Sequence, residues 1–376
     1  MNILVVSVHP KSRGGISSVV IMQSKALNNK VTLFHLSPSS SEDKTRWRKM
    51  IRWLKAIIQF PFLLLPNSID LVHVHGSAAG SFPRKIPFML LSKLFRKKVI
   101  YHMHSGAPEH YINQPSWIKS NIIQCLLNRY DGLVVLSDHW QSVLAPYVRI
   151  PMYSVFNAVE PRKLPDATSV NKPFTVLISG ETGYRKGHFT LLKIVQQLSS
   201  YQNIVFNVAG AGKDLKRLQT IASVQGLNDS IQWLGWLSPA QLDQEYANAD
   251  LFILPTHSEG MPMAILEAMF AGLPVLSTPV GSIPDCIAEG KNGYLFAPED
   301  VKGFAEKILA LKDDPALMKQ LSENARLTAH SQFTPKKFSQ NIRAVYQQVL
   351  IGNNQQRSKH DRKTDNNNDK LRKTAI

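Results

Sequence analysis

The sequence predicts an α/β protein made of two doubly wound, Rossmann-like domains that face each other across a cleft. Short apolar runs alternate with helical patterns along the chain, which is typical of parallel sheets covered by helices on both faces. The alternation stops after Asn157, in a stretch that holds Pro161, Pro165 and Pro173 and lacks apolar periodicity. It restarts at Thr175, so this stretch is expected to link the two domains.

The first domain is predicted to span residues 1–165 and the second residues 166–334. The expected strands of the first are Ile3–Val8, Val31–Phe34, Leu71–Val74, Val99–His102 and Leu133–Leu136, with helices such as Ser17–Leu27 and Pro87–Phe95 between them. Those of the second are Thr175–Ser179, Ile204–Ala209, Ile231–Leu234, Leu251–Pro255 and Pro274–Ser277. We expect residues 335–351 to form a final helix that packs back towards the first domain. Residues 352–376, which have little apolar content, are predicted to be a disordered basic tail.

Composition limits the classes of protein that fit. An apolar content of 44% is normal for a globular chain with a full core. The two cysteines, Cys125 and Cys286, form no C-x-x-C pair, which argues against a disulfide framework and a structural zinc site. The start of the chain does not resemble a signal peptide, and the apolar run Ala56–Pro66 is too short to span a bilayer. A cytoplasmic location is expected.

The net charge of +17 is concentrated in the first half and the tail. Residues 1–165 hold 21 Lys and Arg against 7 Asp and Glu, whereas residues 166–351 hold 16 against 17. Residues 352–376 hold 7 against 3. An asymmetry of this kind indicates an anionic partner for the first half, such as an acidic membrane, a phosphorylated acceptor or a nucleic acid.

The most informative segment is Ala249–Gly281, a strand followed by a polar turn and a helix. Pro262 suits the first helical position, and the helix is expected to stop at Gly272. Its first-turn amides, including those of Met263 and Ala264, have no partner inside the helix. Together with the positive end of the helix dipole they form an anion site suited to a diphosphate.

This segment resembles the family 4 retaining glycosyltransferases of the GT-B fold, within the glycosyl transferases group 1. Their hallmark is two glutamates separated by seven residues, which here are Glu259 and Glu267 in P-T-H-S-E-G-M-P-M-A-I-L-E-A-M. The resemblance extends over most of residues 1–350 and is strongest over 230–300. It implies a nucleotide-sugar donor, linked to UDP or GDP, and transfer without a cofactor. It also implies a catalytic Glu259 that positions the sugar hydroxyls, and a donor-binding set of Gly260, Met261, Met263, Ala264 and Glu267, the last one holding the ribose.

A glycine-rich loop follows the first strand of the second domain and ends in Arg185-Lys186-Gly187. Glycines and paired cations before a helix are typical of a phosphate grip. Lys186 matches the family pattern, but Glu181 stands where the family has an arginine. Either Arg185 supplies the guanidinium from another place, or one phosphate contact is missing. Gly212, in a turn after a later strand, is expected beneath the nucleobase.

In the first domain, Gly15 and His104 are the candidate site residues. Gly14-Gly15 follows the first strand and lets a ligand approach the backbone; the resemblance implies that this loop reaches the donor diphosphate. It also implies that His104, before Ser-Gly at a strand end, faces the transferred sugar. His102 is read as structural, and His73 and His75 as cleft lining or packing. No carboxylate accompanies these histidines at ligand spacing, so no metal site is predicted.

The acceptor is expected on the basic first domain, where residues 45–58 combine tryptophans and cations at helical spacing. Two readings stay open: an ordinary helix with its apolar face in the core, or a helix that docks on the anionic inner face of a membrane, with the tryptophans at the interface. The second reading fits a glycan acceptor linked to a lipid diphosphate, as in surface polysaccharide synthesis.

Three other functions compete with sugar transfer. A nucleotide-sugar epimerase of similar fold would bind the same donor but need no acceptor. A nucleic-acid-binding protein is disfavoured because no recognition module accompanies the charge, so no nucleic-acid partner is expected. A dinucleotide-dependent dehydrogenase is also disfavoured, since no G-x-G-x-x-G follows the first strand.

Overall fold

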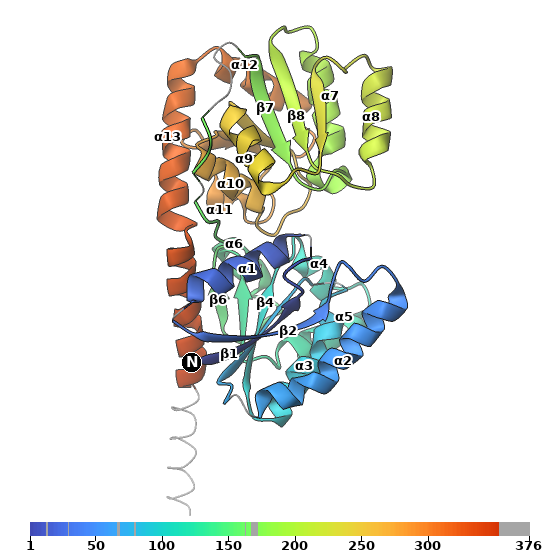
Figure 1. Cartoon of the computed structure of the whole chain (residues 1–376), viewed down its shortest axis with the longest axis vertical. Coiled ribbons are helices and arrows are strands. Elements are labelled where there is room, and N and C mark those ends of the chain that lie inside the picture. The colour runs from blue at the N-terminus through green and yellow to red at the C-terminus, as the bar shows by residue number, and fades with distance from the viewer. Residues whose placement is uncertain are drawn as a thin grey trace, which may run out of the picture.

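A computed structural model describes residues 1–12, 14–28, 30–65, 68–78, 80–161, 163–166 and 172–352. Figure 1 shows two lobes, one above the other, with the helices of the chain end running along one side of both. Each lobe contains one parallel sheet of six strands. The predicted fold class, two doubly wound α/β domains facing across a cleft, is confirmed.

The first sheet has the order β2-β1-β3-β4-β5-β6. Its strands are β1 (Asn2–Val8), β2 (Thr32–Ser39), β3 (Leu71–Gly76), β4 (Lys98–Met103), β5 (Gly132–Val135) and β6 (Met152–Ser154). The helices are α1 (Gly15–Leu27), α2 (Arg46–Leu64), α3 (Phe82–Leu94), α4 (Pro108–Ile112), α5 (Trp117–Leu127) and α6 (Asp138–Leu144). The strand order reverses beside β1, and ligands of open α/β sheets bind outside the carboxyl ends at such a point.

The second sheet has the order β12-β11-β10-β7-β8-β9 and reverses beside β7. Its strands are β7 (Phe174–Ser179), β8 (Ile204–Ala209), β9 (Ile231–Gly235), β10 (Leu251–Leu254), β11 (Val275–Ser277) and β12 (Gly293–Leu295). After the 3-10 turn η1 (Tyr184–Lys186), the helices are α7 (His188–Leu198), α8 (Leu215–Val224), α9 (Pro239–Asn248), α10 (Met263–Ala271), α11 (Ile283–Cys286), α12 (Val301–Lys312) and α13 (Pro315–Gln332).

Two local expectations need correction. Pro262 is the N-cap of α10 rather than its first residue, because its ψ of 114° is extended. The short edge strands β6 and β12 were not predicted, since three residues carry too little pattern.

The last helix, residues 335–352, packs against the first domain although it follows the second in sequence. Its buried Phe338, Ile342 and Tyr346 share one core cluster with Ile3 and Val5 of β1. Figure 1 shows this helix beside the lower lobe, below α13. The exact domain limits stay a prediction, and the predicted tail lies outside the described residues from 353 onward.

None of the helices in the described part of the chain combines the length and apolarity that crossing a bilayer requires.

Candidate active site

A cavity of about 440 Å³ lies between the carboxyl ends of the two sheets. Both domains line it, and seven of the predicted site residues are among its walls: Gly15, His104, Arg185, Glu259, Gly260, Met261 and Met263. The two halves of the sequence thus enclose one cavity, which is the arrangement that the sequence predicts for a site in the cleft.

Glu259 is the centre of a charged cluster at the edge of this cavity. Its side chain is 8% exposed and accepts from Lys186 Nζ at 2.6 Å and Arg185 Nη1 at 3.1 Å. The Thr256 hydroxyl lies 3.3 Å from the same carboxylate oxygen. A buried carboxylate requires such compensation, because leaving it unpaired would carry a large desolvation penalty. The expected phosphate-binding cations and the expected sugar-binding carboxylate thus form one cluster.

Glycines make the close packing of this cluster possible. Gly187 has a φ of 77°, and a Cβ there would lie 1.8 Å from the Pro255 carbonyl oxygen. Across the cleft, a Cβ on Gly106 would lie 2.7 Å from Ser258 Oγ. Ser258 Oγ donates to the Gly106 carbonyl at 3.1 Å, so the β4 loop of the first domain touches the turn that holds Glu259.

The helix α10 carries Met263, Ala264 and Glu267, starting at the cavity wall. No side chain caps its N-terminus, so its first-turn amides face the cleft together with the positive end of the dipole. The Glu267 carboxylate accepts from the Tyr246 hydroxyl at 3.1 Å. Tyr246 in turn lies 3.1 Å from Ser179 Oγ at the end of β7, which orients Glu267 along the carboxyl edge of the second sheet.

His104 projects from the end of β4 into the cavity, as expected. Its Nε2 lies 3.0 Å from His75 Nδ1, and no described protein group is hydrogen-bonded to its Nδ1. Burial lowers the pKa of His104 to about 3, so its imidazole is neutral at physiological pH. A neutral ring held by His75 can donate or accept one hydrogen bond toward a ligand in the cavity.

Behind His104 lies a stack of three more histidines, namely His73, His75 and His102. Adjacent rings have centroids 4.1–5.3 Å apart, because side chains two apart on a strand share a face and β3 pairs with β4. One ring nitrogen from each lies within 4.8 Å of the others, a group that could hold a metal ion. The sequence did not foresee this arrangement. The three rings are buried inside the first domain, beneath the residue that faces the cavity.

The remaining donor-side prediction, Gly212, lies apart from the cavity walls. A Cβ there would be 2.2 Å from the Thr182 carbonyl oxygen, so the turn packs directly on the loop that ends in Lys186. Gly14 and Gly15 differ, since a Cβ on either would meet no described protein atom within 4 Å. Packing therefore explains the glycine at 212, and open space lies in front of the pair at 14–15.

Sequence reasoning missed the groups that hold the site together. Tyr246 orients Glu267 from another helix, and Trp140 Nε1 donates across the cleft to the Gly260 carbonyl at 3.1 Å. Thr256 positions Glu259 and contacts the Arg185 carbonyl at 2.8 Å. Only Thr256 stood inside the recognised segment, three residues before Glu259, where a side-chain hydroxyl before a buried carboxylate was the available signal.

Two parallel α/β domains that face each other across a cleft form a fold of the GT-B type. Residues 160–328 match the family model described as glycosyl transferases group 1. The fold is shared with sucrose-phosphate synthase from Thermosynechococcus elongatus, at a TM-score of 0.79, 18% identity and coverage of 93% of this chain and 99% of that one. A structure of Anabaena HepE in complex with UDP and glucose gives a TM-score of 0.74 at 18% identity, covering 92% and 99%.

Two curated relatives carry names that refer to different products. N-acetyl-alpha-D-glucosaminyl L-malate synthase from Bacillus anthracis is 24% identical over 297 residues, which cover 76% of each chain. The putative colanic acid biosynthesis glycosyltransferase WcaL from Salmonella typhimurium is 23% identical over 239 residues, covering 60% of this chain and 59% of that protein. The family match supports a glycosyltransferase, and the names of these relatives leave the acceptor open.

Proposed function

We propose that the protein is a family 4 retaining glycosyltransferase that moves a sugar from a UDP- or GDP-linked donor to a lipid-linked glycan, without a metal ion, at the inner face of the membrane. The observation that carries this proposal is the contact of Lys186 and Arg185 with Glu259 at the cavity edge. Two phosphate-binding cations and a carboxylate suited to sugar hydroxyls lie within hydrogen-bond distance of one another.

Donor binding would exchange these partners. A donor diphosphate at the N-terminus of α10 draws Lys186 and Arg185 towards its oxygens, which frees Glu259 to accept from the sugar hydroxyls. Glu267, set one turn along α10 and oriented by Tyr246, accepts from the ribose. The two cations and the helix dipole then supply the positive charge for which other enzymes use a metal ion.

In the reaction, the bond between the sugar C1 and the diphosphate oxygen breaks while negative charge grows on the diphosphate. Lys186, Arg185 and the α10 amides stabilise that charge, which lowers the barrier. The acceptor hydroxyl bonds to C1 from the same face, and its proton passes to the departing phosphate oxygen. Neutral His104 lies on the opposite wall, where it hydrogen-bonds the sugar.

The outward face of α2 supports a membrane-bound acceptor. Trp47, Ile51, Leu54, Ile58, Phe62 and Leu65 recur every three or four residues and are 36–70% exposed; we call them the α2 stripe. The face that packs inward is a different one, made of Ala56, Phe60 and Leu64. One expectation needs correction: Trp53 does not face a membrane, because it packs on the core and its Nε1 donates to the Arg84 carbonyl at 2.9 Å.

The relatives support the same setting. A role in surface polysaccharide synthesis agrees with the name of the Salmonella relative, and a UDP-linked donor with the contents of the HepE structure. Apolar side chains exposed in a row beside the cations of α2 fit the headgroup region of an anionic membrane.

The proposal is tested first by its donor. UDP or GDP should raise the melting temperature of the protein, because a ligand that binds only the folded state stabilises it. With the matching radiolabelled sugar nucleotide and a lipid-linked saccharide, the product should keep the anomeric configuration of the donor, and excess chelator should leave the rate unchanged. Conversion of the donor without acceptor would favour an epimerase, and loss of transfer on chelation would contradict metal independence.

A further inference from the structure

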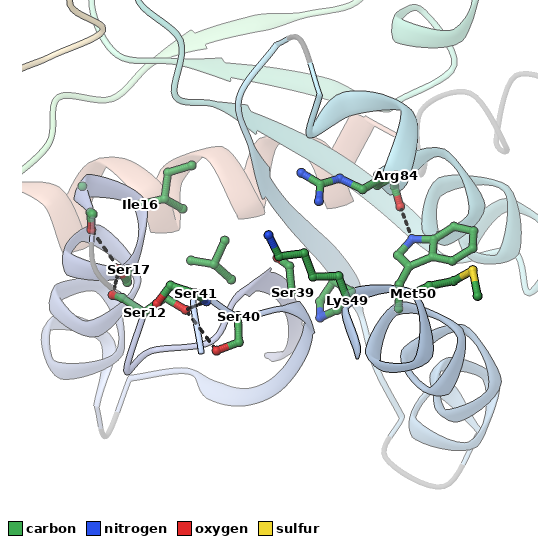
Figure 2. A pocket seen from close by; sticks show the side chains of 14 residues that line it. Ser12, Ile16, Ser17, Ser39, Ser40, Ser41, Lys49, Met50 and Arg84 are labelled. Atoms are coloured by element: carbon green, nitrogen blue, oxygen red, sulfur yellow. Dashed lines mark hydrogen bonds between the residues drawn. The ribbon is translucent and has the colours of Figure 1, made fainter. Parts of the chain in front are cut away.

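A second cavity, of about 580 Å³, lies entirely within the first domain and adjoins the reaction cavity. The loop after β1, the loop after β2, the start of α2 and the start of α3 enclose it. Gly15 and Ile16 line both cavities, so the β1 loop is their common wall. Figure 2 shows Lys49 and Arg84 extending their charged ends into this second space, across from Ile16.

Neither of these two cations has a carboxylate within ion-pair distance in the part of the chain that the structure describes, although Asp43 attracts Lys49 at longer range. The cavity lining contains no Asp or Glu, and neither Lys49 nor Arg84 forms an ion pair with any residue in the described part of the chain. Arg52, on the same helix as Lys49, is different: it donates to Asp43 at 2.5 Å. Two unpaired cations on one wall without carboxylates make a site that favours an anion of about two charges.

The position of Arg84 is set by its neighbours rather than by a charge partner. Its Nε donates to the Gly80 carbonyl at 2.8 Å, and its own carbonyl accepts from Trp53 Nε1 at 2.9 Å. The Trp53 ring forms part of the cavity wall. The inward turn of Trp53 thus fixes the helix that carries Arg84 against the helix that carries Lys49.

Hydroxyl groups line the opposite wall. Ser12, Ser39 and Ser40 all face the cavity, and the Ser41 amide donates to Ser12 Oγ at 3.0 Å, which holds the two loops together. Serine hydroxyls are frequent hydrogen-bond donors to phosphate oxygens. Cations on one side and hydroxyls on the other suit a phosphate better than a carboxylate or a neutral sugar.

Hydrocarbon can lie directly beside this polar site. Met50 lines the cavity and is 41% exposed, and Trp47 and Leu54 of the α2 stripe lie one helical turn from it on the helix surface. A single path therefore leads from the exposed apolar stripe, past two unpaired cations, to the shared wall at Gly15 and on to His104 and Glu259.

We propose that this second cavity binds the diphosphate of the lipid-linked acceptor, with Lys49 and Arg84 as its main partners. The hydrocarbon chain then lies along the α2 stripe, and the acceptor sugar crosses the β1 loop into the reaction cavity. The proposal rests on the function proposed above and specifies where the acceptor phosphate sits.

The test uses the full chain with the donor site filled by whichever nucleotide diphosphate stabilises it, and inorganic diphosphate as the probe. Binding is followed by calorimetry and by acetylation of lysines with mass-spectrometric readout. Inorganic diphosphate should slow the acetylation of Lys49 at least threefold and leave that of Lys55, an exposed cation of α2 outside the cavity, unchanged. The double variant K49Q/R84Q should weaken diphosphate binding at least tenfold.

The double variant R46Q/K55Q is the matched control, because it removes the same charge from exposed α2 positions outside the cavity and should bind the probe like the parent. Equal weakening in both double variants would overturn the site in favour of general charge attraction, as would a lack of diphosphate binding. Farnesyl diphosphate should bind more tightly than inorganic diphosphate; equal affinities would overturn the lipid path. The variant K49Q/R84Q should keep full affinity for the nucleotide diphosphate, so a failure of the second cavity leaves the donor site intact. A failure of the proposed function would instead appear as a lack of nucleotide diphosphate binding by the parent protein.

Discussion

The two domains share one architecture but present different chemistry at their facing edges. In the second, Lys186 and Arg185 are bound to Glu259, and glycines such as Gly187 are required by contacts too close for a side chain. In the first, His104 faces the cavity above a stack of buried histidines, and the neighbouring cations Lys49 and Arg84 form no ion pair with a described residue. The difference teaches that the cleft edge of the second domain depends on close backbone packing, whereas the first domain presents surface charge and exposed apolar side chains.

The largest expected difference between the two domains is the loss of folding stability at acidic pH. Burial lowers the pKa of His73 and His104 to about 3 and that of His75 and His102 well below 6.5, so all four are neutral in the folded protein. The unfolded chain takes up a proton at each below about pH 6.5. Their stabilising contribution is therefore complete above that pH and is lost as pH falls below it.

In the second domain, His188 has its pKa lowered to about 4 by burial. Amide hydrogen exchange between pH 6.5 and 4 should show the strands of the first domain losing protection before those of the second. Earlier loss of protection in β7–β10 would contradict the contrast.

The next largest effect should come from Glu259→Gln. Turnover should fall by about 10²–10³-fold, since a charged contact to the reacting sugar is lost. Nucleotide diphosphate should bind at least as tightly as before, because Lys186 and Arg185 no longer have a competing partner. Steady-state transfer and calorimetry measure the two effects, with Glu299→Gln as the exposed control. Weaker nucleotide binding in the Glu259 variant would show that the carboxylate supports the donor phosphates instead.

Lys186→Ala and Glu267→Ala should have smaller, binding-type effects. Each should weaken nucleotide diphosphate binding by about 1–3 kcal/mol, the usual loss for a charge-assisted hydrogen bond. Lys302→Ala, whose side chain is 77% exposed on α12, is the matched control. Unchanged affinity in both site variants would remove the donor site from this edge of α10.

The smallest effects belong to α2. The protein should sediment with vesicles rich in anionic lipid and not with neutral ones, and salt should weaken the binding because the Debye length shrinks from about 10 Å at 0.1 M to about 3 Å at 1 M. Each of Arg46, Arg48 and Lys55 changed to Gln should remove about 1 kcal/mol. Trp47→Ser should weaken binding a few-fold at constant charge.

The basic residues 353–376 could bind vesicles independently, so a chain ending after Gly352 is measured beside the full chain. Indifference of that shorter chain to anionic vesicles would assign the attraction to the terminal segment and favour a soluble acceptor.

The sequence predicted the fold because apolar strands alternate with helices and because linker prolines mark the break. Most of the candidate site in the second domain could also be predicted from sequence, since Glu259, Lys186 and Glu267 lie in contiguous motifs whose backbone geometry is local. It could not predict that Lys186 and Arg185 pair with Glu259, because 73 residues separate these segments and only the adjacency of β7 and β10 brings them together.

The first domain resisted prediction for the same reason. The pairing of β3 with β4 stacks His73 and His75 on His102. The register of this pairing cannot be predicted from the sequence of either strand alone. The residues at 45–58 fitted an inward and an outward helix equally well, and only their packing on β2 and α3 decides which face is covered. Trp53 illustrates this limit of sequence-based prediction, because its indole packs inward although most of its neighbours in residues 45–58 are exposed.

The final helix has a consequence for how the protein is made. Residues 338–349 complete a core cluster whose other members include Ile3 and Val5 of the first strand. The final helix is translated after the second domain, so part of the core of the first domain stays uncovered until the second domain has been made. During that interval the second domain can already fold, because its strands and helices all precede residue 333. The domain that is synthesised first therefore completes its core last.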